Sequence, residues 1–481
     1  MPYGKTRKHA WLAIAGLAGA QLLTLSGCTM IPAYQRSPLP VASRYPETSA
    51  TEAAPTASGI SWRDFFQDDR LKALIELALV NNRDLRVAVL NVEESRAQYR
   101  VTRSASFPAV EGSGSMTRSK VSLAGFPRGT PGTSAPATFS STQYSASIGT
   151  TSYELDLWGR VRSLNRQALE KYLATEEAQR SAQISLIAQI ATEYFTLRQA
   201  QEALELSRET LQAVTESYDL NKATFDAGVS NELDLREAQA QVETAKINVL
   251  TYENQKAQAE NYLALLVGQP LPHDLPAPRR FSDSDLLPEI QAGLPSELLE
   301  RRPDILEAEH TLKAANANIG AARAAFFPTI TLTGSIGSAS PELSQLLGSG
   351  TGVWSFSPQI TLPIFNGGKT RANLDAARVG ERIEVANYEK AIQTAFREVA
   401  DALVGVDKYS QQVVEDAALI EAQQRRYDLA TLRYRQGADT YLNVLTAQQD
   451  LYSAQQGLLQ AQFHKLSSQI SLYQSLGGGW T

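Results

Sequence analysis

The chain has 481 residues, of which 43% are hydrophobic and 20% charged, and its formal net charge is −6. This apolar fraction is enough for a buried core, and a single Cys excludes both a disulfide scaffold and a cysteine-based zinc or iron–sulfur cluster. The mildly acidic balance argues against a nucleic-acid partner, and four scattered His residues lack metal-ligand spacing.

The first 27 residues have the composition of a secretory signal. Basic residues precede an apolar stretch from Trp11 to Leu25, and small residues then lead into Cys28. Leu25-Ser26-Gly27-Cys28 resembles the bacterial lipobox, which implies cleavage before Cys28 and a lipid on it, both N-acyl and S-diacylglycerol. The alternative is an ordinary signal with a chance Cys. Because Thr29 rather than Asp follows, sorting to the outer membrane is favoured. The proline-rich residues 28–60 are predicted to be an extended, lipidated tether.

The rest of the chain contains one unit twice. The tetrapeptide that begins at Asn82 matches the one that begins at Arg302, an offset of 220, whereas Gly268 matches Gly477 at an offset of 209. We therefore predict an internal tandem duplication. The first repeat covers residues 61–268 and the second covers 297–479, with a linker at 269–296.

Each repeat contains two stretches in which apolar and polar residues alternate. They predict strands within about 108–158 and about 327–365, in detail Val110 to Arg118, Tyr144 to Trp158, a strand around Ile330 to Ile336, and Trp354 to Ile364. Loops rich in Gly, Ser and Pro are expected at Ser119 to Thr142 and Ser338 to Gly352. A half-buried soluble sheet would also alternate, but the strand lengths favour a membrane barrel. Four strands cannot close a barrel, so it must be shared between chains.

Long helical hairpins are predicted at residues 160–267 and 369–476. Arg160 to Phe225 contains no Pro or Gly and is about 66 residues long, so as a helix it would extend roughly 100 Å. Gly228 and Gly437 end the two long helices, and a second helix of about 35 residues then returns in each hairpin.

Several short motifs of the sequence match those of a known family. They are Trp62, Phe65-Phe66 and Asp69; Leu298 to Ile305; Ala314 to Gly320; Phe326-Phe327-Pro328; Leu362 to Gly368; and Leu476 to Trp480. With this order of elements, the chain resembles the outer-membrane efflux channel family (TolC-like), in its lipoprotein branch. The resemblance implies a mixed α/β membrane protein that forms a homotrimer. Its 12-stranded transmembrane β-barrel, with four strands per chain, would continue into a long periplasmic α-helical barrel. It also implies a periplasmic membrane-fusion adaptor and an inner-membrane efflux pump as partners.

The resemblance implies two kinds of site at the hairpin tips. Adaptor-contacting residues are expected at Gly228, Val229, Ser230, Gly437 and Ala438. A pore constriction is expected to involve Asp439, Asp234 and Tyr434. Asp439 could instead cap a helix beginning at Thr440, because Asp is a favoured N-cap residue. Arg433 or Arg435 could pair with it, and the sequence leaves that choice open.

The predicted function is that of a passive outer-membrane conduit for drugs or other small toxic compounds. Metal-cation efflux is an alternative cargo, and a non-pore structural lipoprotein of the periplasm is an alternative of a different class. A lipid-anchored hydrolase is disfavoured because the sequence shows no nucleophile with a coupled base. We therefore expect no enzyme activity and no cofactor besides the lipid on Cys28.

Overall fold

The computed structural model describes residues 29–42, 45, 60–122, 138–279, 281, 287–288, 290 and 298–479. The predicted signal sequence, Cys28 and most of the predicted linker lie outside the described residues. The chain divides into two compact units. Unit 1 combines the N-terminal segment up to Arg36 with Glu94–Leu173 and His310–Val385, and unit 2 combines Ser37–Glu93, Ala174–Glu309 and Ala386–Thr481. Each unit thus takes segments from both repeats, so the repeats are not separate domains.

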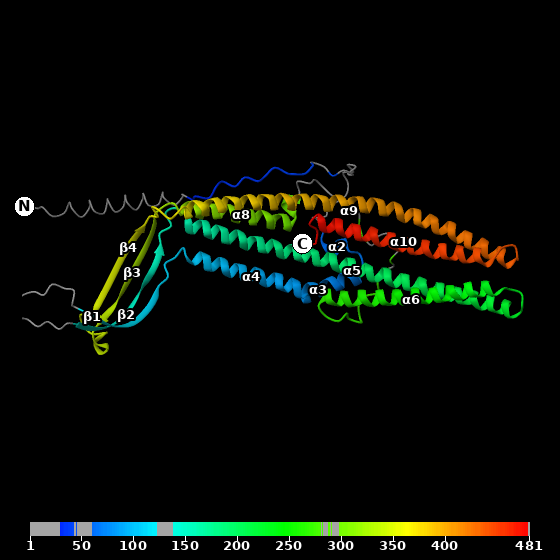
Figure 1. Ribbon diagram of the computed structural model, residues 1–481, viewed down its shortest axis with the longest axis horizontal. Coiled ribbons are helices and arrows are strands. Elements are labelled where there is room, and N and C mark those ends of the chain that lie inside the picture. Colours follow the sequence, from blue (N-terminus) through cyan, green and yellow to red (C-terminus); the bar gives the residue numbers. More distant parts are fainter. Residues whose placement is uncertain are drawn as a thin grey trace, which may run out of the picture. The chain divides into compact units, whose positions relative to one another are not determined.

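Unit 1 contains a four-stranded antiparallel sheet in the order β1-β2-β3-β4 (Figure 1). The strands are β1 (Glu111–Ser122), β2 (Thr138–Glu154), β3 (Thr329–Ser340) and β4 (Gly352–Thr361). A register shift between Thr150 and Tyr153 interrupts the pairing of β2 with β3. Within the described residues β1 and β4 are the edges of the sheet, so each leaves one row of backbone groups for another strand.

The two faces of this sheet differ in chemistry. One face carries cross-strand pairs of large or apolar residues, such as Met116 with Tyr144 and Ile148 with Ile336, over most of its length. Near the β1–β2 connection the same face carries Arg118 and Lys120. The other face carries hydroxyl pairs: Ser113 with Ser147, Ser115 with Ser145, Ser119 with Ser141 and Ser335 with Ser355, at oxygen–oxygen distances of 2.8–3.0 Å. Apolar and polar faces of this kind are typical of a barrel with lipid outside and water inside.

The strand boundaries differ from those predicted. β1 continues to Ser122 and β2 begins at Thr138, so strand pairing extends into the predicted loop Ser119 to Thr142. There the hydroxyl groups of Ser119 and Ser141 satisfy each other across the strands, which a search for apolar alternation does not detect. At the other end, β2 stops at Glu154 rather than Trp158, since Trp158 instead donates from its ring nitrogen to the carbonyl oxygen of Pro328. β4 stops at Thr361 rather than Ile364.

Four long helices connect with the sheet. They are α4 (Arg83–Ser104), which leads into β1; α5 (Arg160–Asp226), which follows β2; α8 (Pro303–Ala324), which leads into β3; and α9 (Lys369–Arg435), which follows β4. The two 67-residue helices agree closely with the sequence prediction. The first turn of α5 is held by Asp156, whose carboxylate accepts the backbone N–H groups of Val161 and Arg162. None of the helices in the described part of the chain has the length and apolarity of a membrane-spanning helix.

Unit 2 adds the returning helices and a small helical layer. Its elements are α2 (Trp62–Phe65), α3 (Asp69–Asn81), α6 (Glu232–Val267), α7 (Leu298–Arg301) and α10 (Tyr441–Ser475). In its core Phe65 stacks on Tyr473 with ring centroids 4.0 Å apart. Asp68 is buried and accepts a hydrogen bond of 2.8 Å from the Tyr194 hydroxyl. Because burial removes water and Asp68 is negative, the pKa of Tyr194 is raised.

The duplication is visible in two equivalent junctions of unit 2. Asn82 donates its side-chain N–H to the carbonyl of Leu266, and its counterpart Arg302 donates to the carbonyl of Ser475, the equivalent of Leu266. The neighbouring Gly268 and Gly477 have φ angles of 79° and 77°. A Cβ on Gly268 would lie 2.4 Å from the oxygen of Asn81, and one on Gly477 would lie 2.7 Å from the oxygen of Arg301. The two repeats therefore dock their first helices on the ends of their last helices in the same way.

Candidate functional site at the hairpin tips

The first tip, residues 224–234, joins α5 to α6 through a glycine turn. Gly228 has a φ of 73°, its N–H donates to the carbonyl of Phe225 at 2.8 Å, and the N–H of Val229 donates to the carbonyl of Thr224 at 2.9 Å. This pair of bonds is the Schellman motif, which satisfies carbonyls at a helix end. The left-handed φ explains the glycine, because a Cβ is disfavoured there.

The second tip, residues 433–443, repeats this turn between α9 and α10. Gly437 has a φ of 69°, its N–H donates to the carbonyl of Tyr434 at 2.9 Å, and the N–H of Ala438 donates to the carbonyl of Arg433 at 2.9 Å. A Cβ on either tip glycine would meet nothing within 4 Å in the described residues. The constraint at these glycines is therefore backbone conformation, and the space around them is open.

Polar side chains on the first tip form a closed local arrangement. Asn231 is the N-cap of α6; its side-chain oxygen accepts the N–H of Asp234 at 2.9 Å, and its side-chain N–H donates to the Asp234 carboxylate at 3.1 Å. Val229 is 80% exposed and Ser230 is half-buried. Asp234 thus belongs to the N-terminal cap of α6, and its carboxylate is bonded to the side chain of the N-cap residue.

Asp439 on the second tip is held by three neighbours. One carboxylate oxygen accepts the N–H of Thr440 at 2.9 Å and the side-chain N–H of Asn443, and the other accepts the guanidinium N–H of Arg433 at 3.0 Å. These interactions, led by the bond from Asn443, lower the pKa of Asp439. Asp439 is therefore ionised with a cation on its own tip. The partner is Arg433 rather than Arg435.

One expectation for this tip needs correction. The helix does not begin at Thr440 with Asp439 as its cap: α10 begins at Tyr441, Thr440 is the N-cap, and Asp439 precedes it. Asp234 and Asp439 occupy different positions in their hairpins, because the offset of 209 matches Asp439 with Ser230 and Asp234 with Asn443. The first tip therefore has a neutral hydroxyl where the second tip has a carboxylate.

Tyr434 lies between the two hairpins of the chain. Its hydroxyl donates to the side-chain oxygen of Asn221 on α5 at 3.0 Å, and its ring centroid is 5.4 Å from that of Tyr441. The Tyr441 hydroxyl in turn lies 2.9 Å from that of Ser217 on α5. Burial raises the pKa of both tyrosines, so both stay neutral at physiological pH. This tyrosine pair fixes the spacing of the hairpins just above the tips.

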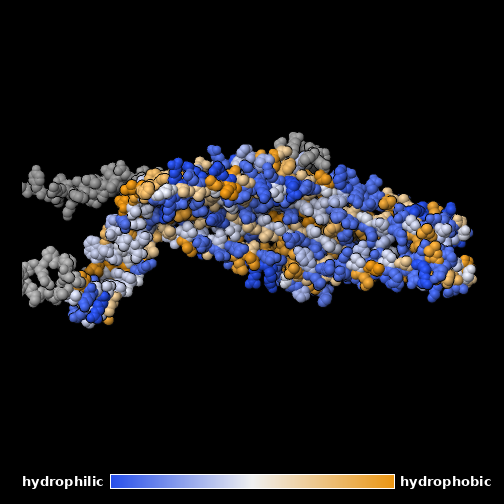
Figure 2. All heavy atoms as spheres, in the orientation of Figure 1, coloured by the Kyte–Doolittle hydropathy of each residue, from blue (hydrophilic) through white to orange (hydrophobic). Residues whose placement is uncertain are grey.

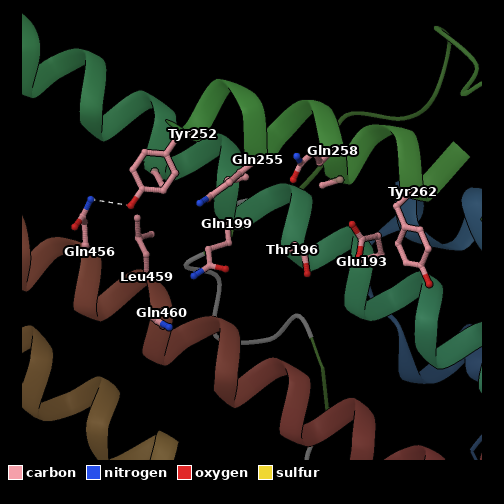
Figure 3. Close-up of a pocket in the computed structure, with 13 residues that line it drawn as sticks. Glu193, Thr196, Gln199, Tyr252, Gln255, Gln258, Tyr262, Gln456, Leu459 and Gln460 are labelled. Carbon is pink, nitrogen blue, oxygen red and sulfur yellow. Dashed lines mark hydrogen bonds between the residues drawn. The ribbon is translucent and has the colours of Figure 1, made fainter. Parts of the chain in front are cut away.

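A polar groove of about 530 Å³ lies farther from the tips, between α5, α6 and α10 (Figure 3). Five glutamines and two tyrosines line it, and Tyr252 accepts a hydrogen bond of 2.8 Å from Gln456. Glu193 is the one charged residue of the lining, and burial raises its pKa. The groove is hydrophilic and brings together no nucleophile and base.

The family described as outer membrane efflux protein matches residues 74–269 and 294–478, one segment in each repeat. The chain belongs to this family. The match covers both hairpins and both pairs of strands. It confirms the resemblance expected from the sequence.

Individual relatives cover nearly the whole chain. The toluene efflux pump outer membrane protein TtgC of Pseudomonas putida is 47% identical over 460 residues, which are 95% of this chain and 93% of that protein. The cation efflux system protein CusC of Escherichia coli is 41% identical over 462 residues, 95% of this chain and 97% of that protein. The open state of the Neisseria gonorrhoeae MtrE outer membrane channel has a TM-score of 0.85 and 39% identity, with 94% of this chain and 99% of that chain covered.

These findings confirm the fold, the function class and the location predicted from the sequence. The chain is an efflux channel protein of the outer membrane, with its helical part in the periplasm. A homotrimeric, 12-stranded barrel with four strands from each chain agrees with the four-stranded sheet and with these relatives. The non-pore structural alternative is thereby set aside.

Proposed function

We propose that three copies of this chain form the passive exit conduit of a tripartite efflux system for toxic organic compounds. The observation that carries this proposal is the sheet of unit 1, with one apolar face, one hydroxyl-rich face and two open edges. An open edge cannot remain in lipid, so β1 of one copy pairs with β4 of the next. The hydroxyl-rich faces then line the water-filled interior.

The cargo class follows from the relatives. TtgC is named for toluene efflux and CusC for cation efflux, and the chain shares more identical residues with TtgC. We therefore assign organic compounds, including drugs and solvents, as the cargo, with metal cations as the second candidate. A conduit conducts passively, so the chain acts without enzymatic activity and without a cofactor.

The partners are a periplasmic membrane-fusion adaptor and an inner-membrane efflux pump. The open space around Gly228 and Gly437 and the exposure of Val229 support adaptor contact at the tips, together with Ser230 and Ala438. Three copies of Asp439 around the axis would form the constriction, with Asp234 and Tyr434 behind it. Its pairing with Arg433 makes this constriction a set of ion pairs at rest rather than a bare anionic ring.

The N-terminal part of the proposal rests on sequence. Residues 1–27 are a lipoprotein signal peptide, and Cys28 carries the lipid that joins the chain to the outer-membrane bilayer. Replacement of Cys28 by Ser behind a non-lipoprotein signal should still give trimers, because the barrel strands hold the protein in the membrane. A soluble periplasmic monomer would overturn the barrel assignment.

Gene deletion tests the proposed cargo. A strain without the gene should accumulate toluene, antibiotics and fluorescent dyes, and the wild-type gene should restore export. Accumulation of copper and silver ions is measured in the same strains for comparison. Sensitivity to metal ions alone would replace the organic cargo with the cation alternative, and unchanged accumulation in every arm would contradict the efflux proposal.

A further inference from the structure

Helix α4 carries an unusual charge pattern where it approaches the sheet. Its last ten residues contain Arg96, Arg100 and Arg103 and no acidic residue. All three arginines are exposed, and the structure gives none of them an ion-pair partner among the described residues. The negative end of the helix dipole accounts for a cation in the last turn only. Three unpaired arginines over ten residues indicate an anionic partner outside the chain.

Helix α9 shows the same pattern where it leaves the sheet. Lys369 and Arg371 in its first turn are exposed and have no ion-pair partner among the described residues. A helix N-terminus disfavours cations, so the dipole cannot explain this pair. Farther along, Arg378 is partly neutralised by Asp375 at 3.6 Å.

Exposed apolar residues separate these cations from the strands at both edges of the sheet. Phe107 and Val110, between α4 and β1, are 63% and 69% exposed. Ile364 and Phe365, between β4 and α9, are 92% and 91% exposed. Figure 2 shows hydrophobic surface at the sheet end of α9, beside the hydrophilic surface of the helices. Going outward from the sheet, each edge strand is followed by these exposed apolar residues, here called the apolar collar, and then by a basic helix. A chain that leaves a bilayer passes the hydrocarbon boundary and then the charged headgroups in the same order.

Helix rotation places Arg96, Arg100 and Arg103 of α4 and Arg371 and Arg378 of α9 on one side of unit 1. On α4 each arginine directly follows a half-buried residue, Ser95, Tyr99 or Thr102, of which Tyr99 stacks on Tyr172 of α5. On α9 Arg371 follows half-buried Thr370, and Arg378 follows buried Ala377. One residue corresponds to about 100° of helix rotation. Because α4 and α9 run in opposite directions and pack from opposite edges of the sheet, the same rotation turns both sets to the same side.

The N-terminal segment identifies this side. Asn316 and Arg323 of α8 donate to the carbonyls of Pro32 and Met30, so residues 29–34 lie as a strap along α8. Arg166 of α5 lines the cavity of about 400 Å³ beside this strap. The side chain of Asn165 on α5 donates to the hydroxyl of Ser106 just after α4, so Asn165 faces α4. Arg166 is the next residue of α5, and the same rotation of about 100° places it on the basic side. The strap is the continuation of Cys28, and the proposed lipid on Cys28 makes this the side that faces the bilayer rather than the lumen.

We propose that Arg96, Arg100, Arg103 and Arg371 form a binding surface for the phosphate headgroups of anionic phospholipids in the periplasmic leaflet of the outer membrane. Guanidinium groups bind phosphate oxygens in a bidentate manner, and the apolar collar contacts the upper acyl chains. The proposal rests on the outer-membrane location and, for the choice of side, on the proposed lipidation of Cys28.

The test compares lipids retained by the purified full-length trimer. Trimers exchanged into nanodiscs of phosphatidylglycerol and phosphatidylcholine should keep phosphatidylglycerol preferentially in native mass spectra. Each basic residue beside an anionic surface contributes roughly five-fold in affinity. We therefore expect R96Q/R100Q/R103Q to lose most of the preference, and further loss when R371Q is added. The matched control R86Q/K222Q/R425Q removes three exposed basic residues of unit 2 and should keep it.

Further arms separate the alternatives. R96K/R100K/R103K keeps the charge and should retain most of the preference, which excludes a defect of folding as the cause. Soluble glycerol phosphate should not displace the lipid, since a free phosphate lacks acyl chains. An unchanged phosphatidylglycerol preference in the glutamine variants would overturn the proposal. Changed ion selectivity with unchanged lipid preference would place the arginines in the lumen, and loss of trimers in both lipids would place them between subunits.

Discussion

The two hairpin tips share a backbone turn but hold their charges differently. Both end a 67-residue helix with a Schellman motif at a left-handed glycine. The first tip then closes its polar groups between Asn231 and Asp234, whereas the second forms an ion pair between Arg433 and Asp439. The backbone turn that projects the tips is therefore the same in both repeats. The ion pair of the second tip joins residues on either side of the glycine turn, whereas that of the first, between Glu232 and Arg236, lies within α6. We therefore expect a change of charge at the second tip to affect conduction more than one at the first tip.

Loss of the shared turn should have the largest effect. G228V/G437V places β-branched residues at φ angles near 70°, which costs on the order of 1–2 kcal/mol per site and reshapes both turns. We expect efflux to be abolished while trimers still form, because both glycines are remote from the sheet in the sequence and a Cβ on either would meet nothing within 4 Å in the described residues. Dye efflux and gel mobility of unheated trimers measure the two properties. Normal efflux in a stable double variant would contradict adaptor contact at the tips.

Replacing one aspartate on each tip by asparagine should distinguish the roles of the two tips most clearly. D439N removes a charge from the proposed constriction and should lower cation selectivity in planar bilayers. D234N alters only a local cap and should leave selectivity unchanged. Equal effects of the two variants would remove the distinction between the tips.

The depressed pKa of Asp439 also fixes the direction of its pH dependence. A carboxyl whose pKa is lower in the folded state stabilises the tip above its unfolded pKa, and this contribution is lost as the pH falls through the folded value. Wild-type selectivity should therefore persist at neutral pH and fall only below the ordinary carboxyl range, near pH 4. D439N should show no such step in conductance titrations.

Removing the cation of the second tip should change cation selectivity in the opposite direction to D439N, and by a smaller amount. R433Q leaves Asp439 without its counter-ion and should raise cation selectivity, whereas R435Q removes a nearby charge that has no ion-pair partner among the described residues. The Arg433 side chain is 61% exposed, so the effect on stability should be small. Reversal potentials in asymmetric salt measure the change. Identical behaviour of R433Q and R435Q would show that the ion pair does not matter.

The smallest effect is expected above the tips. Y434F removes the hydrogen bond to Asn221 but keeps the ring that packs on Tyr441, so the cost should be about 1 kcal/mol. A drop of about 1 °C in the melting temperature, with unchanged selectivity, is the expected result. A large change in selectivity would instead place Tyr434 in the pore lining.

The sequence predicted best what depends on composition over long distances. The absence of Pro and Gly between Arg160 and Phe225 predicts one uninterrupted helix. Matching short motifs at offsets of 220 and 209 predict the duplication, which the junctions at Gly268 and Gly477 display. These features arise from many residues acting together, so errors at single positions do not matter.

Features that depend on a single contact were not predictable. Arg433 and Arg435 are alike in sequence, and only the geometry of the turn selects Arg433 as the partner of Asp439. The strap was expected to be part of a simple tether, because its prolines suggest extended chain. Its attachment uses Asn316 and Arg323, residues almost 300 positions away that donate to backbone carbonyls without any signal in the sequence. The Ser119–Ser141 pair in the lengthened parts of β1 and β2 was hidden for a related reason, since the composition there is that of a loop.

The central claim, that open-edged sheets from three chains close into one pore, can be tested by disulfide crosslinking in the outer membrane. Ser115 of β1 would be changed to Cys and combined in turn with Cys at each position from 354 to 360 of β4, while S115C/S145C, opposite each other within one sheet, serves as the control that oxidation works. The account predicts that at least one β1–β4 pair yields a covalent trimer. Formation of the control disulfide without any crosslink between chains would contradict it.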